Sequence, residues 1–329
     1  MSRPERVVLL GKRGFIATHL RRHLEERGIP FKAVGKDEVD LTHPAAAAKL
    51  NDVIRETDAV VIASALTPDK GRNFRTLMEN LRMAETLCEL FEEKTCAHVI
   101  YLSSDAVYDA RHIPLDEDSS REPMDLHALM HTAREMMLGA VLSARQVPYC
   151  ILRPVNIYGF GDTHNSYGPN RFIREAFGDR KITIFGKGEE RRCHLYIADA
   201  VRLIGLCVEK RSTGTFNLAP PRTTPFMRAA EMIRLACPFP VDIEFKPRTV
   251  PTIHRPYKVT QAFRFIYNLG RPIGPIVHRP YVVTKLRRAF PEFRFTPTRE
   301  AIEEYVRQYR KSVEKAADLG PRGAGRALP

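Results

Sequence analysis

Two histidines four residues apart, His127 and His131, stand in the segment DLHALMHTARE, residues 125–135. Positions i and i+4 of a helix share one face, so both imidazoles are expected to point the same way. An unperturbed imidazole titrates near ~6.5, which suits it to exchange a proton with a substrate near neutral pH. The segment therefore predicts general acid–base chemistry on one face of a helix.

A second segment, GKRGFIA, has the spacing G-x-x-G-x-x-A directly after the apolar run RVVLL. Glycines permit a tight turn and let the backbone approach a pyrophosphate, which then lies at the positive N-terminus of the following helix. A lone glycine pattern is weak evidence, but its position between a strand and a helix strengthens it. We expect Gly11, Gly14, Phe15 and Ile16 to bind a dinucleotide cofactor.

The elements that would position these residues alternate along the chain. Short apolar runs predict five strands, at 6–11, 30–35, 58–65, 97–104 and 148–159. Apolar residues at helical spacing predict helices at 14–28, 74–93 and 126–145. Continuous apolar strands alternating with helices are typical of a parallel sheet covered on both faces. The sequence thus predicts an α/β fold, with a doubly wound parallel Rossmann-type sheet and a smaller α/β substrate lobe.

Loops rich in Gly, Pro and Asn indicate a second lobe from about residue 156 onward. We expect residues 1–155 with about 191–220 to form the dinucleotide-binding domain, in which TGTFNLA returns to the first sheet. Residues of about 156–190 with 221–312 would form the substrate lobe, and 313–329 a disordered tail. The segment HRPYKVT at 254–260 recurs as HRPYVVT at 278–284, which indicates a local duplication.

The composition narrows the class of protein. No stretch approaches the ~20 apolar residues of a membrane span, no signal peptide is evident, and the six cysteines lack metal-ligand spacing. We therefore expect a cytoplasmic protein with reduced thiols and no metal. The net charge is +13, with ten Lys or Arg and no carboxylate between Glu244 and Glu292. This block is either a solvated basic face or a surface for an anionic partner; without a nucleic-acid motif, nucleic acid is not expected to bind.

Nine segments in the N-terminal ~220 residues resemble, in order, those of the extended short-chain dehydrogenase/reductases, also called the NAD-dependent epimerase/dehydratase family. They are GKRGFIATHL, DEVDLT, VVIASA, MENLRMAETL, VIYLSSDAVYD, PLDEDS, LRPVNIYG, DTHNSYGPNRFI and FGKGEERRCHLYIADAV. The resemblance implies an NAD(P)-dependent enzyme. It also implies that Asp40 and Leu41 bind the adenine and that Ala63, Ser64 and Ala65 line the floor of the cofactor site. Asn80 would support a helix beside the site, and Pro154 and Val155 would contact the nicotinamide.

The resemblance further implies three catalytic positions: a Ser or Thr that orients the substrate, a Tyr that exchanges the proton, and a Lys that binds the nicotinamide ribose and lowers the Tyr pKa. Ser104 matches the first, while His127 and His131 occupy the Tyr and Lys positions. Three interpretations stay open. His127 exchanges the proton while His131 bonds the ribose; or Ser104, Asp105 or Tyr108 supplies the proton; or the chain is a non-catalytic NAD(P)-binding regulator or scaffold.

The choice between NADP(H) and NAD(H) depends on the residues after the second strand, where NAD-selective sites carry a carboxylate. Here the strand ends in AVGK, with no acid before Asp37. Lys36 and the loop residue Arg13 could instead pair with a 2′-phosphate, and this loop resembles the NADP-dependent reductase branch that makes GDP-fucose. The sequence favours NADP(H), with NAD(H) as the alternative if both cations are surface residues.

The substrate implied by the resemblance is a small sugar-like molecule, nucleotide-linked or otherwise anionic. The residues expected to contact it are Asp105, Tyr108, Asn156, Asn165, Arg192 and Arg279. The favoured reaction is NADPH-dependent interconversion of a ketone and a secondary alcohol, and an NAD-dependent sugar 4-epimerase is the alternative. Asp105-Ala106 lacks the Asp–Glu pair typical of 4,6-dehydratases. Leu and Met stripes at 73–93 and 125–145 are typical either of this family's homodimer interface or of core packing.

Overall fold

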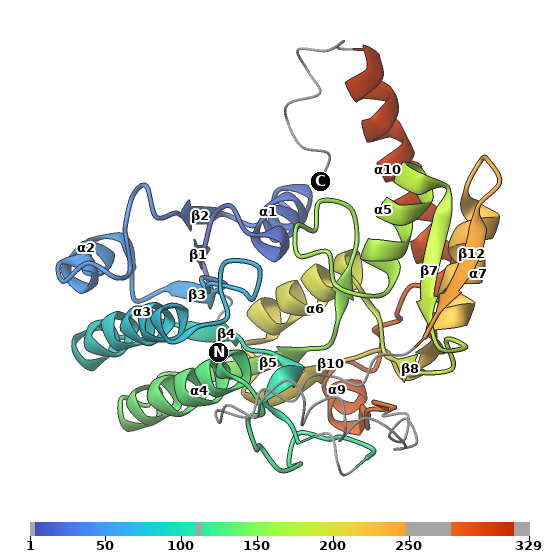
Figure 1. Cartoon of the computed structure of the whole chain (residues 1–329). Helices are drawn as coiled ribbons and strands as arrows, with labels where there is room; N and C mark the ends of the chain where they lie inside the picture. The colour runs from blue at the N-terminus through green and yellow to red at the C-terminus, as the bar shows by residue number, and fades with distance from the viewer. Residues whose placement is uncertain (1–3, 110–112, 248–277, 319–329) are drawn as a thin grey trace.

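The central sheet is the frame on which the candidate site is built. The computed structural model describes residues 4–109, 113–247 and 278–318, and its six-stranded sheet has the order β10-β5-β4-β3-β1-β2 (Figure 1). The strands are β1 (Arg6–Leu10), β2 (Phe31–Val34), β3 (Asp58–Ile62), β4 (His98–Leu102), β5 (Tyr149–Pro154) and β10 (Gly214–Leu218). Every adjacent pair is parallel, so the predicted parallel α/β sheet is confirmed, including the late strand that returns to it.

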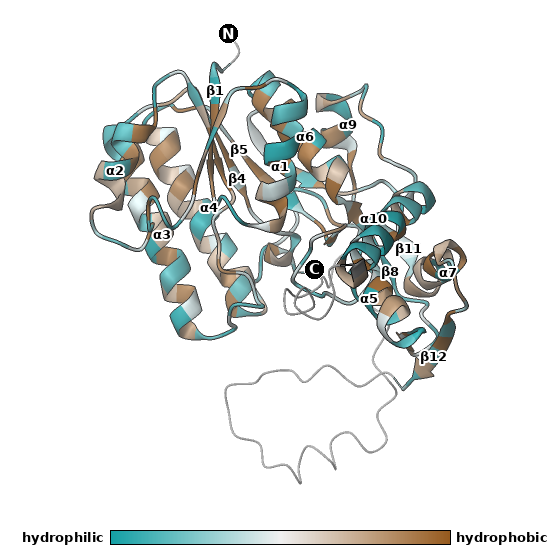
Figure 2. Cartoon of the chain, turned by 90° about the horizontal axis from the view of Figure 1, so that it is seen from above, coloured by the Kyte–Doolittle hydropathy of each residue, from teal (hydrophilic) through white to brown (hydrophobic). Residues whose placement is uncertain are grey.

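Each strand can contribute side chains to two hydrophobic cores, because successive side chains point to opposite faces of the sheet. Val7 and Leu9 of β1 join one core, and Val8 and Leu10 join the other. The first core packs under α1 (Phe15–Glu26) and α6 (Ile197–Lys210), and the second under α2 (Ala46–Val53), α3 (Phe74–Glu93) and α4 (Leu126–Ala144). Figure 2 shows these two helical layers on opposite sides of the strands. Burial of both faces explains why the strands are unbroken apolar runs.

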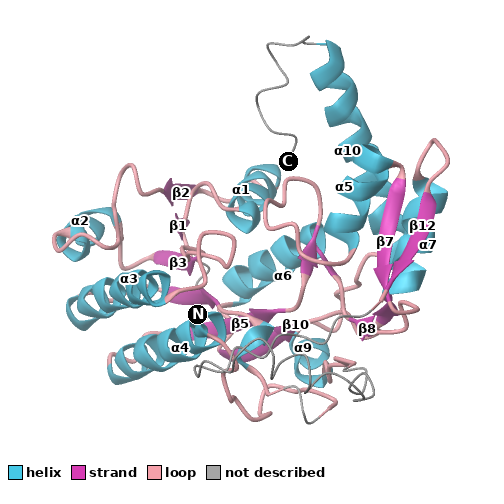
Figure 3. Ribbon diagram, viewed as in Figure 1, coloured by secondary structure: helices cyan, strands magenta, loops and turns pink. Residues whose placement is uncertain are grey.

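A smaller group of elements lies beside the sheet (Figure 3). Helices α5 (Pro169–Asp179) and α7 (Phe226–Ala236) pack on β7 (Lys181–Phe185), which pairs with β12 (Asp242–Lys246), and α10 (Thr298–Asp318) packs on α7. The remaining elements are β6 (Ile157–Tyr158), β8 (Arg191–Arg192), β9 (Leu195–Tyr196), β11 (Thr224–Pro225) and α9 (Thr284–Ala289). Within the described ranges, no helix combines the length and apolarity needed to cross a bilayer.

The structure corrects three local predictions. The strand expected at 148–159 divides into β5, which pairs with β10, and β6, which pairs with β9. Helix α2 lies in a segment for which no element was predicted. Helix α10 continues to Asp318, beyond the predicted start of the tail at 313, because KSVEKAAD is rich in good helix formers. Residues 319–329 and the HRPY copy at 254–260 lie outside the described residues.

The carboxyl ends of the strands meet at one edge of the sheet because the strands are parallel. The loops that leave this edge carry Gly11 after β1, Ala63 after β3, Ser104 after β4 and Asn156 after β5. Helix α4 contacts the 3₁₀ turn η1 (Asp105–Val107), which follows β4. Ligands of open α/β sheets bind at this edge, so the fold gathers the predicted site residues where a ligand is expected.

Candidate active site

The turn after β1 forms a cradle for an anion. Gly11 has a φ of +110°, and a Cβ there would lie 2.9 Å from the backbone N of Ser64, so this position requires glycine. Helix α1 begins after Gly14 with no side-chain cap and no acidic residue in its first turn. Its first N–H groups and its positive dipole end therefore suit a phosphate. Phe15 and Ile16, the other predicted residues, lie in that first turn.

The floor predicted for the cofactor is fixed by side chains from two helices. Asn80 of α3 accepts a hydrogen bond from the Leu66 N–H at 2.9 Å and donates to the Leu66 carbonyl at 3.1 Å. Arg134 of α4 donates to the Ser64 carbonyl at 2.9 Å. Hydrogen bonds from Asn80 and Arg134 thus fix the backbone of the loop from Ala63 to Leu66. The other predicted cofactor residues lie at the ends of three strands of the same sheet, with Leu41 after β2, Ala65 after β3, and Pro154 and Val155 at the end of β5.

Arg13 and Lys36, the two cations predicted to select NADP(H), each lie near a carboxylate. An Arg13 guanidinium nitrogen is 3.3 Å from Asp37 Oδ2, and Lys36 Nζ is 3.3 Å from Asp40 Oδ2. Asp40 also accepts hydrogen bonds from the N–H and hydroxyl of Thr42. Both cationic side chains are about four-fifths exposed, at 80% and 78%. Exposed pairs of this kind are weak, so both cations can exchange partners.

The two histidines lie together near the start of α4. Asp125 caps this helix by accepting a hydrogen bond from the Ala128 N–H at 2.8 Å, which fixes where the helix begins. The rings of His127 and His131 are 4.7 Å apart, centroid to centroid, and perpendicular at 89°. His131 Nδ1 lies 2.8 Å from the Tyr101 hydroxyl of β4. The shared helix face predicted from the sequence is confirmed, and Tyr101 is a partner that the sequence did not reveal.

Burial favours the neutral form of both imidazoles. Burial lowers the pKa of His127 below 6.5, against the opposing charge of Asp125. Burial lowers the pKa of His131 well below 6.5, and His127 and the Arg134 guanidinium lower it further. Near pH 7 His131 is therefore uncharged. It cannot supply the positive charge that the sequence resemblance assigns to a lysine at this position.

Ser104 and Tyr108, close neighbours in sequence, have different surroundings. Ser104 is half-buried, and its Oγ accepts a hydrogen bond from the Ala106 N–H at 3.1 Å. Tyr108 is 1% exposed. Its hydroxyl donates to Asn217 Oδ1 at 2.6 Å and accepts from Arg153 at 2.8 Å. The structure therefore places the Tyr108 ring in the core with its hydroxyl engaged by Asn217 and Arg153, which does not favour the predicted roles of Tyr108 as substrate contact or proton source.

A buried ion pair that the sequence did not reveal lies one helical turn beyond His131. Arg153 donates to both oxygens of Glu135, at 2.9 Å and 2.6 Å. Ser103 Oγ, next to Ser104, donates to Glu135 Oε1. Both members of the pair are 3% exposed. This network joins α4 to the ends of β4 and β5, and so fixes the helix that carries the histidines relative to the strand that leads to Ser104.

Three of the predicted substrate residues come together from distant parts of the chain. Asp105 Oδ2 accepts a hydrogen bond from the Tyr281 hydroxyl at 2.6 Å and lies 3.3 Å from the Arg279 guanidinium. The backbones of Arg192 and Arg279 form a β-bridge. Within the part of the chain that the structure describes, one buried guanidinium nitrogen of Arg192 and Nε of Arg279 have no hydrogen-bond partner. Such donors suit an anionic ligand.

The two predicted asparagines contact side chains from the second lobe. Asn156 accepts a hydrogen bond from the Ser166 hydroxyl at 3.1 Å. Asn165 adopts a positive φ of 50° and accepts from Arg174 at 3.1 Å. Their side-chain oxygens are therefore engaged in fixing the loop at 164–168, which leaves the amide nitrogens as the groups to assign to a substrate.

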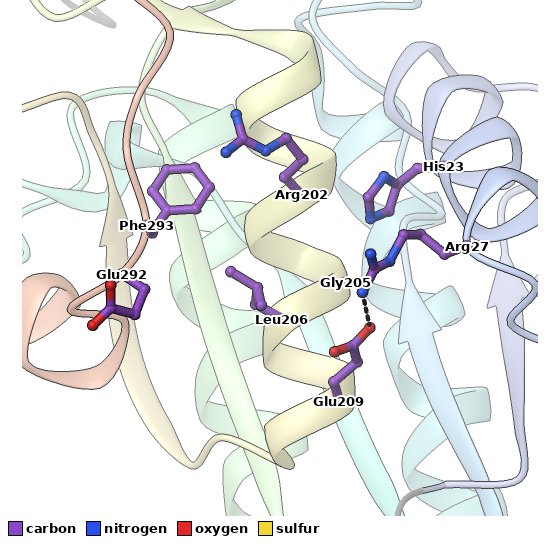
Figure 4. A pocket seen from close by; sticks show the side chains of 8 residues that line it. All are labelled: His23, Arg27, Arg202, Gly205, Leu206, Glu209, Glu292 and Phe293. Atoms are coloured by element: carbon purple, nitrogen blue, oxygen red, sulfur yellow. Dashed lines mark hydrogen bonds and ion pairs between the residues drawn. The ribbon is translucent and has the colours of Figure 1, made fainter.

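A cavity of about 430 Å³ lies apart from these residues, between α1 and α6 (Figure 4). It is lined by His23, Arg27, Arg202, Gly205, Leu206, Glu209, Glu292 and Phe293. Arg27 and Glu209 form an ion pair of 3.5 Å across it. None of the predicted site residues lines this cavity, so we do not assign the predicted chemistry to it.

The buried neutral histidines predict a loss of stability in mild acid. Burial lowers the pKa of His98 to about 4 and that of His194 to about 3, and it lowers that of His131 well below 6.5. An unfolded histidine titrates near ~6.5 and binds protons that the folded state excludes, so this contribution is full above ~6.5 and is lost as the pH falls. Urea unfolding between pH 7 and pH 5 should show the free energy of unfolding falling, by up to ~1.4 kcal/mol per pH unit for each histidine. His194→Phe should reduce the dependence of the free energy of unfolding on pH. An unchanged dependence would contradict the conclusion that His194 is buried in its neutral form.

The comparisons with known proteins agree with this geometry. A model of the NAD dependent epimerase/dehydratase family matches residues 7–219. The chain is 26% identical over 240 residues to the UDP-N-acetyl-alpha-D-glucosaminuronate decarboxylase of Bacillus cytotoxicus, over 64% of this chain and 73% of that protein. It is 23% identical over 276 residues to the dTDP-4-dehydro-6-deoxy-D-allose reductase of Streptomyces bikiniensis, over 73% and 84%. A GDP-L-fucose synthetase from Naegleria fowleri bound to NADP shares the fold, with a TM-score of 0.75, 16% identity and coverage of 95% and 96%.

Proposed function

The chain belongs to the NAD dependent epimerase/dehydratase family, and from this premise we propose that it is an NADP(H)-dependent oxidoreductase that interconverts a ketone and a secondary alcohol on a nucleotide-linked sugar. Both curated relatives named above are enzymes whose names specify nucleotide-linked sugars. The observation that carries the proposal is the placing of the His127–His131 pair and the Gly11–Gly14 cradle at the same edge of the sheet.

The residues of the cradle fit a dinucleotide. The backbone of Gly11 and the N-terminus of α1 would hold the pyrophosphate, since no side chain caps that helix. The loop after β3, held by Asn80 and Arg134, would line the floor. A bound nicotinamide would accept or supply the hydride. His127 then donates its proton to the carbonyl oxygen on reduction, or accepts it from the hydroxyl on oxidation, while the Ser104 hydroxyl orients that oxygen.

The first test is cofactor identity and turnover. Any nucleotide that copurifies is identified by mass spectrometry, and NADPH and NADH are titrated by fluorescence. NADPH oxidation is then followed with dTDP-4-dehydro-6-deoxy-D-glucose as the ketone. Reversible NADPH binding with ketone-dependent oxidation supports the reductase. Tightly retained NAD⁺ with interconversion of UDP-glucose and UDP-galactose supports the 4-epimerase instead. Binding of neither cofactor contradicts the proposal.

The cofactor preference is tested at Asp37. In the structure its carboxylate lies near both Lys12 and Arg13. If Arg13 binds the 2′-phosphate of NADP(H), Asp37→Ala frees it and should strengthen NADPH binding, whereas Arg13→Ala should weaken it by about tenfold with little change for NADH. Fluorescence titration gives both dissociation constants. If Asp37→Ala weakens NADH binding while Arg13→Ala leaves NADPH binding unchanged, Asp37 holds a ribose hydroxyl and the preference is for NAD(H).

We also propose that α3 and α4 form a homodimer interface. These helices pack on each other, yet Phe74, Met78 and Met136 on them remain 66%, 46% and 64% exposed. Large exposed apolar side chains on two helices that pack together favour an interaction site there. Met136→Lys should therefore convert a dimer to a monomer in size-exclusion chromatography with light scattering. Leu235→Lys on α7, at a side chain that is 69% exposed, is the matched control and should leave the mass unchanged. A wild-type monomer at micromolar concentration would contradict the proposal.

A further inference from the structure

Arg134 is a buried arginine with an unexpected set of partners. It is 0% exposed and follows His131 by three residues, so it lies on the histidine face of α4. One guanidinium nitrogen donates to the Ser64 carbonyl at 2.9 Å, and the group lies 5.2 Å from the centroid of the Tyr101 ring. Among the described residues no carboxylate forms an ion pair with it, and its Nε has no partner. Arginine is almost never fully buried unless it is paired.

The carboxylate next to Arg134 in the sequence is paired with other groups. Glu135, the next residue, uses both oxygens for Arg153 and also accepts from Ser103. Its charge is therefore compensated on the side of α4 that faces β5. The Arg134 guanidinium therefore lies beside Tyr101, His131 and the loop at Ser64. Water is largely excluded from this buried region, so Coulomb interactions there are strong.

The bond between Tyr101 and His131 fixes the position of the imidazole proton. Tyr101 is 2% exposed, and its hydroxyl bonds only to His131 Nδ1 in the described part of the chain. If Nδ1 carried the hydrogen, the single hydroxyl hydrogen of Tyr101 would be buried without an acceptor. If Tyr101 donates to Nδ1, that hydrogen is satisfied and Nε2 of the neutral ring carries the other hydrogen. In this second arrangement the buried hydroxyl hydrogen of Tyr101 has an acceptor, so it is the arrangement that we expect.

We propose that two residues divide the role of the absent lysine: His131, positioned by Tyr101, donates a hydrogen bond through Nε2–H, and Arg134 supplies the fixed positive charge. This inference rests on the proposed function, in which that hydrogen bond goes to a hydroxyl of the nicotinamide ribose. Tyr101 and Arg134 act through His131 and the Ser64 loop, so they are positioning residues.

The charges around the pair are consistent with this division. The groups that face His131 are His127 and Arg134 on its own helix and Tyr101 on β4. The groups that face His127 are Asp125, Asp105, His164 and Arg72. Two carboxylates, together with Arg72, therefore lie on the side of His127, which must take up a proton, whereas Arg134 lies on the side of His131, which must stay neutral.

The tautomer is tested directly by two-bond ¹H–¹⁵N correlation spectra of protein labelled at histidine, with His131→Gln used to assign the signal. The wild type should show the Nε2–H tautomer of His131 from pH 8 to pH 5, with no imidazolium. Tyr101→Phe should lose this single form, whereas Tyr149→Phe, which removes a phenol hydroxyl bonded to Ser143 instead of to a histidine, should keep it. An Nδ1–H tautomer, or an imidazolium near pH 7, would overturn the inference.

The charge is tested by titrating His131 in two variants of Arg134, with His98 and one variant of Arg211 as the control. Arg134→Met should raise the pKa of His131 by about one unit or more, and Arg134→Lys should keep it low. The matched control is Arg211, which also bonds a backbone carbonyl, that of Ala97, and also has an Nε without a partner. Its charge lowers the pKa of His98, so Arg211→Met should move His98 and leave His131 in place.

The outcomes separate this inference from the proposed function. If the pKa of His131 is the same in Arg134→Met as in the wild type, the proposed electrostatic role of Arg134 is wrong. If Arg134→Met does not fold, the Tyr101→Phe spectra and the Arg134→Lys titration still decide the matter. These spectra need no turnover, so a chain with the expected tautomer but no activity would refute the oxidoreductase and leave the side-chain assignment standing. For an active enzyme, Tyr101→Phe should lower kcat and change its pH profile more than it changes the KM of the ketone.

Discussion

His127→Phe is expected to lower kcat for ketone reduction by about 10²–10⁴-fold while changing the Kd of NADPH by less than about twofold. The ring of phenylalanine fills the same space but can neither donate nor accept the proton. The cradle of Gly11 and Gly14 is formed by other elements, so cofactor binding does not depend on this side chain. Rates are measured with NADPH and dTDP-4-dehydro-6-deoxy-D-glucose, and His23→Phe in the separate cavity of Figure 4 is the control.

The same variant should lose a characteristic pH dependence. Reduction needs the protonated ring, and burial lowers the pKa of His127 below 6.5. The rate of reduction should therefore rise as the pH falls through that lowered pKa, and alcohol oxidation, which needs the neutral ring, should rise as the pH increases through it. Full activity in His127→Phe would show that Ser104 or Asp105 supplies the proton by another route.

The turn after β1 is the part of the candidate site whose geometry the sequence predicts well. GKRGFIA is a local motif: its turn, its uncapped helix and the required glycine at position 11 all lie within one strand–helix unit. The i, i+4 relation of His127 and His131 is equally local, because it depends only on helix geometry. Apolar runs such as β3 and β4 are predictable because both faces of a parallel sheet are buried.

The partners of the histidines are not predictable in the same way. Tyr101 reaches His131 only because β4 packs against α4, and Tyr108 points into the core although it follows Ser104 by four residues. The sequence shows Arg134 and Glu135 side by side, but only the packing shows that one is paired and the other is not. The contact of Asp105 with Arg279 spans 174 residues. Such long-range contacts have no local pattern.

Arg153→Met is expected to destabilise the protein by about 3 kcal/mol, because it removes the bidentate partner of the buried Glu135 carboxylate and leaves that carboxylate the ion pair with Arg121 at 3.2 Å. The pair is bidentate and nearly inaccessible to solvent, and contact with Glu135 raises the pKa of Arg153. Urea unfolding at pH 7 measures the loss. Arg171→Met removes a more exposed i, i+4 pair with Glu175 and should cost less than about 1 kcal/mol.

The double variant Arg153→Met with Glu135→Leu separates the cost of leaving Glu135 without Arg153 from the value of the pair itself. Replacing a buried ion pair by apolar residues is often neutral or stabilising, so the double variant should recover most of the stability that the single variant loses. Its activity should stay low, because Ser103 loses the acceptor that ties the end of β4 to α4. Recovery of both stability and kcat would contradict a positioning role. Recovery of stability alone would show that this pair is retained to align Ser104 with the histidine helix rather than to hold the fold together.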